Sequence, residues 1–147
     1  MVDFNKMIKV GEYLPEFNLV TQSNLPCGPI YQSKGLRVHI EKRHPDCLAY
    51  LPHISEMLEF PDYIGKNPKE PNSIEIVKHY DANIMVAIKL DLKNDYLFIA
   101  SLYAISDGKL KKHLNSGRLK PVCSLSLDLD ASFEKPYNES IKKIKGT

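Results

Sequence analysis

The chain has 147 residues, which suits one ordinary domain and is too short for two comfortable ones. Hydrophobic residues make up 43% and charged residues 26%, as in globular proteins, and no apolar run reaches the roughly 20 residues of a membrane span. The net charge of +2 does not by itself identify a nucleic-acid binder. Because the N-terminus lacks the features of a secretory signal, we expect a cytoplasmic protein with no membrane association.

Three cysteines, Cys27, Cys47 and Cys123, lie far apart and form no CxxC pair. This spacing argues against a disulfide framework or a zinc site, and we interpret them as buried or incidental thiols. No HxH, HExxH or paired carboxylate pattern lies near the histidines. The sequence therefore predicts no metal and no cofactor.

The first part of the chain is predicted to be helical after a short flap. Residues 1–29 hold short apolar pieces split by Gly11 and Pro15, and we expect them to form an N-terminal flap. A first helix is predicted over 34–44, where Pro45 ends it, and a second over 49–60. Three prolines and a glycine in residues 60–71 then predict a loop.

From residue 73 the hydrophobic period changes to two. Strands are predicted over 73–80, 83–91 and 96–105, and their short connections favour an antiparallel meander. A short helix should follow, capped by Ser106. The predicted fold class is α+β over residues 30–130. Two N-terminal helices should pack on an antiparallel sheet of three to four strands, with a short helix after the third strand. A polar C-terminal tail is predicted at 131–147.

The segment RVHIEKRHP, residues 37–45, concentrates two histidines and three basic side chains. In a helix, Leu36, His39, Ile40 and Arg43 would lie along one stripe. A histidine and an arginine at the edge of an apolar stripe suit a cleft that needs a titrating imidazole beside a fixed positive charge. His44 would lie about 140° around the helix from His39, which does not suit metal chelation.

Several motifs in this order resemble a known superfamily. The succession RVHIEKRHP, LPHISEMLEFPDYIGKNP, SIEIVK, IMVAIKLD and YLFIASLYAISDGKL is similar to the phage-associated nuclease-like domains of the barnase, EndoU, colicin and RelE superfamily, over about residues 30–120. The resemblance implies two helices before a four-stranded antiparallel sheet, and metal-independent RNA cleavage. By position, it points to His39, His44, Lys78, Ser101, Tyr103 and Arg118.

Metal-free RNA cleavage needs a base for the 2′-hydroxyl, an acid for the leaving 5′-oxygen and cations for the transition state. His39 is a candidate for either proton role, and Ser101 is a candidate for orienting the phosphate. Tyr103 should share the strand face of Ser101, where it could stack a base. The catalytic candidates are His39, His44, Lys78 and Ser101, and the phosphate or RNA contacts are Arg43, Lys66, Tyr103, Lys112 and Arg118.

Charge is unevenly distributed near the end of the domain. Between Asp107 and Lys120 there are five basic residues against one acidic residue, which gives a local basic patch for phosphates. A solvated helix face is the alternative interpretation of Lys109, Lys111 and Lys112.

The other candidates also have structural interpretations. His39 could be an interface residue, His44 a helix C-terminal cap, and Ser101 a strand-bonded hydroxyl. Arg43 and Lys78 could be solvated or ion-paired side chains. The remaining histidines, His53, His79 and His113, are interpreted as surface or core residues.

Two functional hypotheses follow. The first is a metal-independent endoribonuclease-like domain of phage or mobile-element origin, with a toxin role, RNA (tRNA among the candidates) as substrate and a cognate inhibitor protein as a candidate partner. The second is a catalytically inactive nuclease-fold scaffold that binds RNA or a protein partner. The oligomeric state is left open by the sequence.

Overall fold

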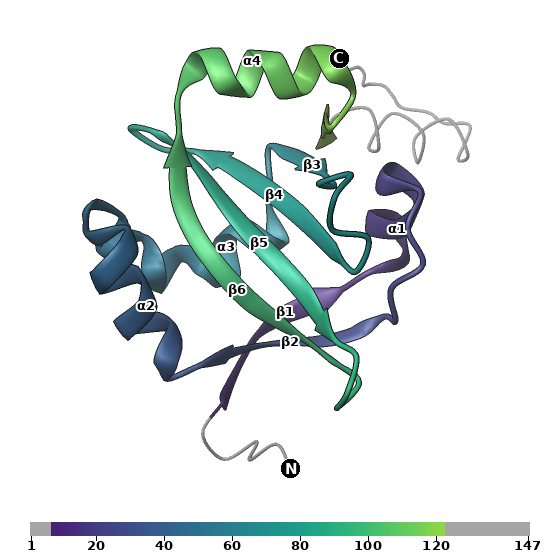
Figure 1. Ribbon diagram of the computed structural model, residues 1–147, viewed down its shortest axis with the longest axis vertical. Helices are drawn as coiled ribbons and strands as arrows, with labels where there is room; N and C mark the ends of the chain where they lie inside the picture. The colour runs from purple at the N-terminus through teal and green to yellow at the C-terminus, as the bar shows by residue number, and fades with distance from the viewer. Residues whose placement is uncertain (1–6, 123–147) are drawn as a thin grey trace, which may run out of the picture.

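The computed structural model describes residues 7–122 (Figure 1). The predicted tail at 131–147 lies outside the described residues. The elements are, in order, β1 (Met7–Tyr13), α1 (Pro15–Thr21), β2 (Gly28–Ser33), α2 (Gly35–Arg43), the 3₁₀ helix η2 (Pro45–His53), α3 (Ile54–Glu59), β3 (Tyr63–Gly65), β4 (Ser73–His79), β5 (Asn83–Asp91), β6 (Tyr96–Ile105), α4 (Asp107–Ser116) and β7 (Leu119–Pro121).

Seven strands form one mixed sheet in the order β1-β2-β6-β5-β4-β3-β7. The β2–β6 pair is parallel and every other pair is antiparallel. The class is α+β, but the predicted architecture of two N-terminal helices on an antiparallel sheet of three to four strands is wrong. Strand β1 and helix α1 precede the first predicted helix, and the second predicted helix is divided into η2 and α3.

The strands that the pattern missed are short or interrupted by turn residues. Strands β3 and β7 have three residues each, and β3 lies in the Pro-rich segment that we expected to be a loop. They pair with each other in the register Gly65↔Leu119, although more than fifty residues separate them along the chain. Such pairings depend on distant partners rather than on local periodicity, so the sequence pattern does not reveal them.

The elements with strong local signals are confirmed. The central strands β4, β5 and β6 match the predicted ranges to within a residue. Helix α2 forms where it was expected and buries Leu36 and Ile40. Ser106 caps α4, because its Oγ accepts a hydrogen bond from the Lys109 backbone N–H at 3.1 Å.

The two faces of the central strands have different environments. Alternate residues such as Ile76, Val86 and Leu102 are fully buried in the main core, which also takes side chains from α1, α2, η2 and α3. Among the described residues, the opposite face is covered only at one end, where α4 crosses the sheet (Figure 1) and packs on a small cluster around Val77 and Met85. The rest of that face, which we call the open face, carries polar side chains.

A β-bulge in β6 decides which side chains reach the open face. Ile99 pairs with Ile88 while Ser101 pairs with Ala87, so Ala100 is an extra residue on this strand. Ile99 is buried in the core. Without the bulge, strict alternation would place position 101 on the core side with Ile99; with it, Ser101 faces the open side.

Candidate active site

A hollow of about 460 Å³ lies between α2 and the open face of the sheet. We call it the histidine hollow. It brings together residues from α2, β4, β5, β6 and the loop before β4, namely His39, Arg43, His44, Asn67, Glu70, Ser73, Glu75, Ala87, Lys89, Ala100, Ser101 and Tyr103.

His39 and Ser101, two of the catalytic candidates, meet at this hollow. The Nε2 atom of His39 lies 3.3 Å from Oγ of Ser101, although 62 positions separate the two residues. Burial of Leu36 and Ile40 orients α2 against the sheet, and this orientation leaves His39 on the edge that faces Ser101. The imidazole side chain remains exposed to solvent.

His44 lies closer to His39 than helical geometry predicts. Helix α2 ends at Arg43, and His44 leaves it with φ −144° and ψ 59° while its N–H still donates to the Ile40 carbonyl at 2.8 Å. The His44 ring centroid lies 6.2 Å from that of His39 and 5.4 Å from that of Tyr103. Burial, followed by the neighbouring His39 and Arg43, lowers the pKa of His44. His44 is therefore both the helix C-cap and a residue of the hollow.

Tyr103 lines the hollow on the same strand as Ser101, as predicted from their spacing. Its hydroxyl donates to the Met85 sulfur at 3.1 Å. Burial, and then the nearby Glu75 carboxylate, raise the pKa of Tyr103. This side chain is thus held as a neutral phenol beside His44.

Glu75 is a residue of the hollow that the sequence analysis missed. It is only 4% exposed and accepts two hydrogen bonds from Arg118, from Nε at 2.9 Å and from Nη2 at 2.7 Å. The hydrogen bonds to Glu75 raise the pKa of Arg118. A carboxylate between Ile74 and Ile76 in an apolar strand was the available signal, because a buried charge requires a partner.

Other charges in the histidine hollow also come in pairs. Nζ of Lys89 lies 2.6 Å from a carboxylate oxygen of Glu70. Arg43, by contrast, forms no ion pair with any described carboxylate and its side chain is exposed. Arg43 is therefore the available cation at this site.

Lys78 does not join the other catalytic candidates. It alternates with Glu75 and Val77 along β4, so it lies on the opposite face of the sheet from Ser101. Its Nζ donates to the Phe60 carbonyl at 2.8 Å. Of His39, Lys78 and Ser101, only His39 and Ser101 therefore lie together in the histidine hollow.

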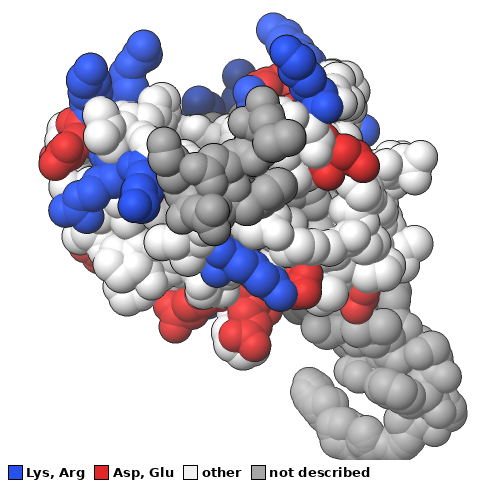
Figure 2. Space-filling view, turned by 90° about the horizontal axis from the view of Figure 1, so that it is seen from below, with Lys and Arg blue, Asp and Glu red and all other residues white. Residues whose placement is uncertain are grey.

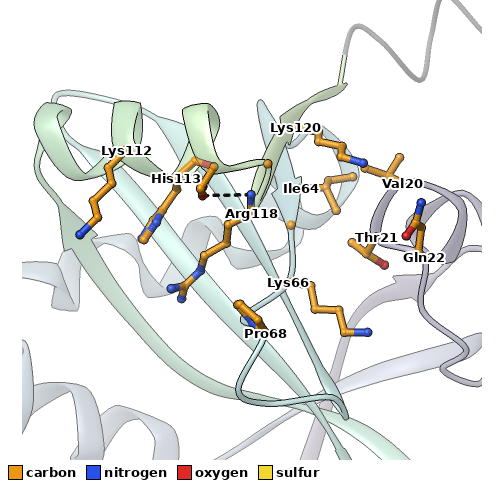
Figure 3. A pocket seen from close by; sticks show the side chains of 13 residues that line it. Val20, Thr21, Gln22, Ile64, Lys66, Pro68, Lys112, His113, Arg118 and Lys120 are labelled. Carbon is orange, nitrogen blue, oxygen red and sulfur yellow. Dashed lines mark hydrogen bonds between the residues drawn. The ribbon is translucent and has the colours of Figure 1, made fainter.

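Three predicted RNA contacts line a second hollow of about 650 Å³, which we call the basic hollow. Lys66, Lys112 and Arg118 contribute to its walls together with Lys120 (Figure 3). Its thirteen lining residues include no Asp or Glu. The structure therefore separates the predicted phosphate contacts into two groups, with Arg43 and Tyr103 in the histidine hollow and the others here.

No group of three or more His, Cys, Asp or Glu side chains in residues 7–122 is arranged to hold a metal ion. Within the same residues, no helix is long and apolar enough to cross a membrane.

Residues 8–112 match the model of one protein family, described as phage-Barnase-EndoU-ColicinE5/D-RelE like nuclease 3. The chain belongs to this family. The match runs from β1 into α4, so it includes every residue named above from the histidine hollow, and it confirms the resemblance seen in the sequence motifs. The protein is thus a phage-type nuclease domain. Comparisons with curated proteins and with solved structures found no match.

Proposed function

We propose that the histidine hollow is the active site of a metal-independent endoribonuclease. The observation that carries this proposal is the 3.3 Å contact between His39 Nε2 and Ser101 Oγ in a hollow that also holds His44. Cleavage of RNA by its own 2′-hydroxyl needs proton transfer at two oxygens and stabilisation of phosphate charge. Two imidazoles, a hydroxyl and a cation supply these functions without a further reagent.

We assign the two proton roles to the two histidines. His44 is the general base, since its lowered pKa keeps the imidazole neutral, and it removes the proton of the 2′-hydroxyl. The 2′-oxygen then forms a bond to phosphorus while the bond from phosphorus to the 5′-oxygen breaks. His39 donates a proton to that leaving oxygen. The products are a 2′,3′-cyclic phosphate and a free 5′-hydroxyl.

Three other residues position the reacting phosphate and its base. Arg43 lines the hollow as an exposed cation and faces the negative charge that develops on the phosphate oxygens. The Ser101 hydroxyl donates a hydrogen bond to one of those oxygens. The Tyr103 ring, next to His44, offers a surface for the neighbouring base. Lys78 has no part in this proposal, because it lies on the other face of the sheet.

The test is digestion of total RNA and of a defined tRNA in EDTA by wild-type protein and by His39→Ala. We expect His39→Ala to lose about 10²- to 10⁴-fold in rate. His53→Ala is the matched control, because His53 lies in η2 with a half-exposed side chain outside the histidine hollow, and it should cleave like the wild type. An RNA with a 2′-deoxy nucleotide at the cleavage site should remain intact.

Equal products from wild type and His39→Ala, or none from either, would overturn the proposal. RNA binding without cleavage by the wild type would instead support the scaffold hypothesis. We also propose a toxin role in the cytoplasm of a host, with a cognate inhibitor protein as partner, and the phage-type family supports this. Induced expression should then arrest growth for the wild type and not for His39→Ala.

A further inference from the structure

The charged side chains that line the basic hollow are all basic. Lys66 follows β3, Lys112 belongs to α4, and Lys120 lies in β7, so three separate segments contribute lysines to the lining of this hollow (Figure 3). None of these three lysines forms an ion pair with a described carboxylate. On the face shown in Figure 2, by contrast, Lys and Arg lie interspersed with Asp and Glu. Within residues 7–122, the three lysines of the basic hollow therefore form a local concentration of unpaired positive charge.

This hollow adjoins the histidine hollow across a shared wall. In the loop after β3, Lys66 and Pro68 line the basic hollow while Asn67, between them, lines the histidine hollow. The ion pair between Arg118 and Glu75 spans the same wall, since Arg118 lines the basic hollow and Glu75 lines the histidine hollow. The two hollows are thus lined by neighbouring residues of the same segments.

The shared wall is held together by main-chain contacts. The Lys66 N–H donates to the Arg118 carbonyl at 3.0 Å, directly after the register pair of Gly65 with Leu119. A Cβ at Gly65 would collide with that same carbonyl oxygen, so the two strands approach as closely as they do only because this residue is glycine. The positions of Lys66 and Arg118 are therefore fixed relative to each other.

The lining of the basic hollow indicates which ligand chemistry it would accept. Apart from the His113 imidazole, it contains no aromatic ring on which a base could stack. His113 is 7% exposed, and its Nε2 has no hydrogen-bond partner among the described residues. Burial, with the nearby Arg118, lowers the pKa of His113, so Lys and Arg side chains carry the charge. These features suit phosphate groups rather than bases.

We propose that the basic hollow binds phosphates of the RNA strand next to the one that is cleaved, in a sequence-independent manner. This inference rests on the proposed function, because it places the cleaved phosphate in the histidine hollow. It predicts that the three lysines increase the affinity only for substrates that extend beyond the cleavage site. Cleavage of a dinucleotide should not depend on them.

The binding experiment uses a 2′-O-methyl oligonucleotide of about twelve nucleotides, which cannot be cleaved through its 2′-oxygen. Its Kd is measured by fluorescence anisotropy over a series of salt concentrations. The Lys66→Gln/Lys120→Gln double variant should raise the Kd about tenfold, as for two exposed ion pairs. The slope of log K against log salt should fall by about 0.7 for each lysine removed.

Neighbouring lysines of α4 provide the matched control. Lys112 lines the basic hollow and Lys111 does not, although both are exposed and carry the same charge. Lys112→Gln should weaken binding severalfold, whereas Lys111→Gln should leave the Kd close to the wild-type value. Equal effects of these two substitutions, or an unchanged Kd in the double variant, would overturn the proposal.

Cleavage of two substrates then separates this inference from the proposed function. With a twelve-nucleotide RNA the double variant should show a raised KM and an unchanged kcat, while kcat/KM for a dinucleotide stays at the wild-type value. An equal loss on both substrates would overturn the inference. If the wild type cleaves neither but the lysine variants weaken binding as stated, the proposed function fails and the basic hollow stands as a phosphate-binding site.

Discussion

The two hollows of this protein differ in how their charges are compensated. In the histidine hollow, Glu75 is paired with Arg118 and Glu70 with Lys89, and Arg43 is the one lining cation without a carboxylate partner among the described residues. In the basic hollow, three lysines have no carboxylate partner in the described residues. Proton transfer requires the donor and acceptor groups to be held at defined distances from the reacting atoms. Attraction of a polyanion requires only a net positive potential. The two proposals therefore assign different tasks to residues on opposite sides of one wall.

The largest expected effect is confined to the histidine hollow. His44→Ala should lower kcat by about 10²- to 10⁴-fold, because it removes the proposed general base. It should leave the Kd for the 2′-O-methyl oligonucleotide nearly unchanged.

The pH dependence of kcat/KM checks the role of His44 independently. A general base must be deprotonated, so activity should rise with pH through the pKa of His44, which lies below the ordinary histidine value of 6.5. This acid limb should disappear in His44→Ala. A variant that keeps the limb would assign the base to another group.

The next effect tests the wall between the hollows. Gly65→Ala should lower the free energy of unfolding by about 2 kcal/mol or more, because the new Cβ would meet the Arg118 carbonyl and the Leu119 side chain. Gly35→Ala is the matched control in α2, where only the Ser33 hydroxyl lies near the new Cβ, at 3.7 Å. It should be neutral or stabilise by about 0.5 kcal/mol.

Urea unfolding measures both glycine variants. At a temperature at which Gly65→Ala is still folded, we expect this variant to bind the oligonucleotide more weakly and to have a lower kcat. Both effects are expected because the shared wall borders both hollows. Retention of both functions would mean that the shared wall does not position either site.

The smallest effect concerns the ion pair between the hollows. Glu75→Gln should destabilise the fold by about 2 kcal/mol, less than the 3–5 kcal/mol of a fully buried pair, because the Arg118 side chain is 22% exposed and can reach water. The exposed Lys9–Glu12 pair is the control, and Glu12→Gln should change stability by less than about 0.5 kcal/mol. Similar urea midpoints for the two variants would contradict this difference.

Glu75→Gln also leaves the positive charge of Arg118, which lines the basic hollow, without its carboxylate partner. We expect the oligonucleotide to bind more tightly to this variant, since Arg118 is no longer neutralised. Weaker binding would indicate that Glu75 matters mainly by holding Arg118 in place.

Prediction from the sequence succeeded where the signal is local. Alternation over β5 and β6 predicted two strands and placed Ser101 with Tyr103 on one face. It did not reveal the bulge at Ala100, which brings that face to the open side of the sheet. A bulge is defined by pairing with the partner strand, so its position is not written in the alternation of one strand alone.

The candidate site shows the same limit. The place of His39 on the edge of an apolar helix stripe can be read from four residues, Leu36, His39, Ile40 and Arg43. The meeting of His39 with His44 depends on where the helix ends, and the pairing of Glu75 with Arg118 depends on strands that join across the sheet. The sequence places Lys78 on a strand, but the side of the sheet on which Lys78 lies relative to Ser101 follows from the strand pairing.

The sequence by itself determined the central strands, helix α2, the capped helix α4 and the family to which the chain belongs, because periodicity, capping and motif order are local properties. Only the tertiary structure decided the seven-stranded order, the face on which each polar side chain lies and the division of the cations between two hollows. Those features arise from contacts between segments far apart in the chain, whose register is selected by burial of the shared core.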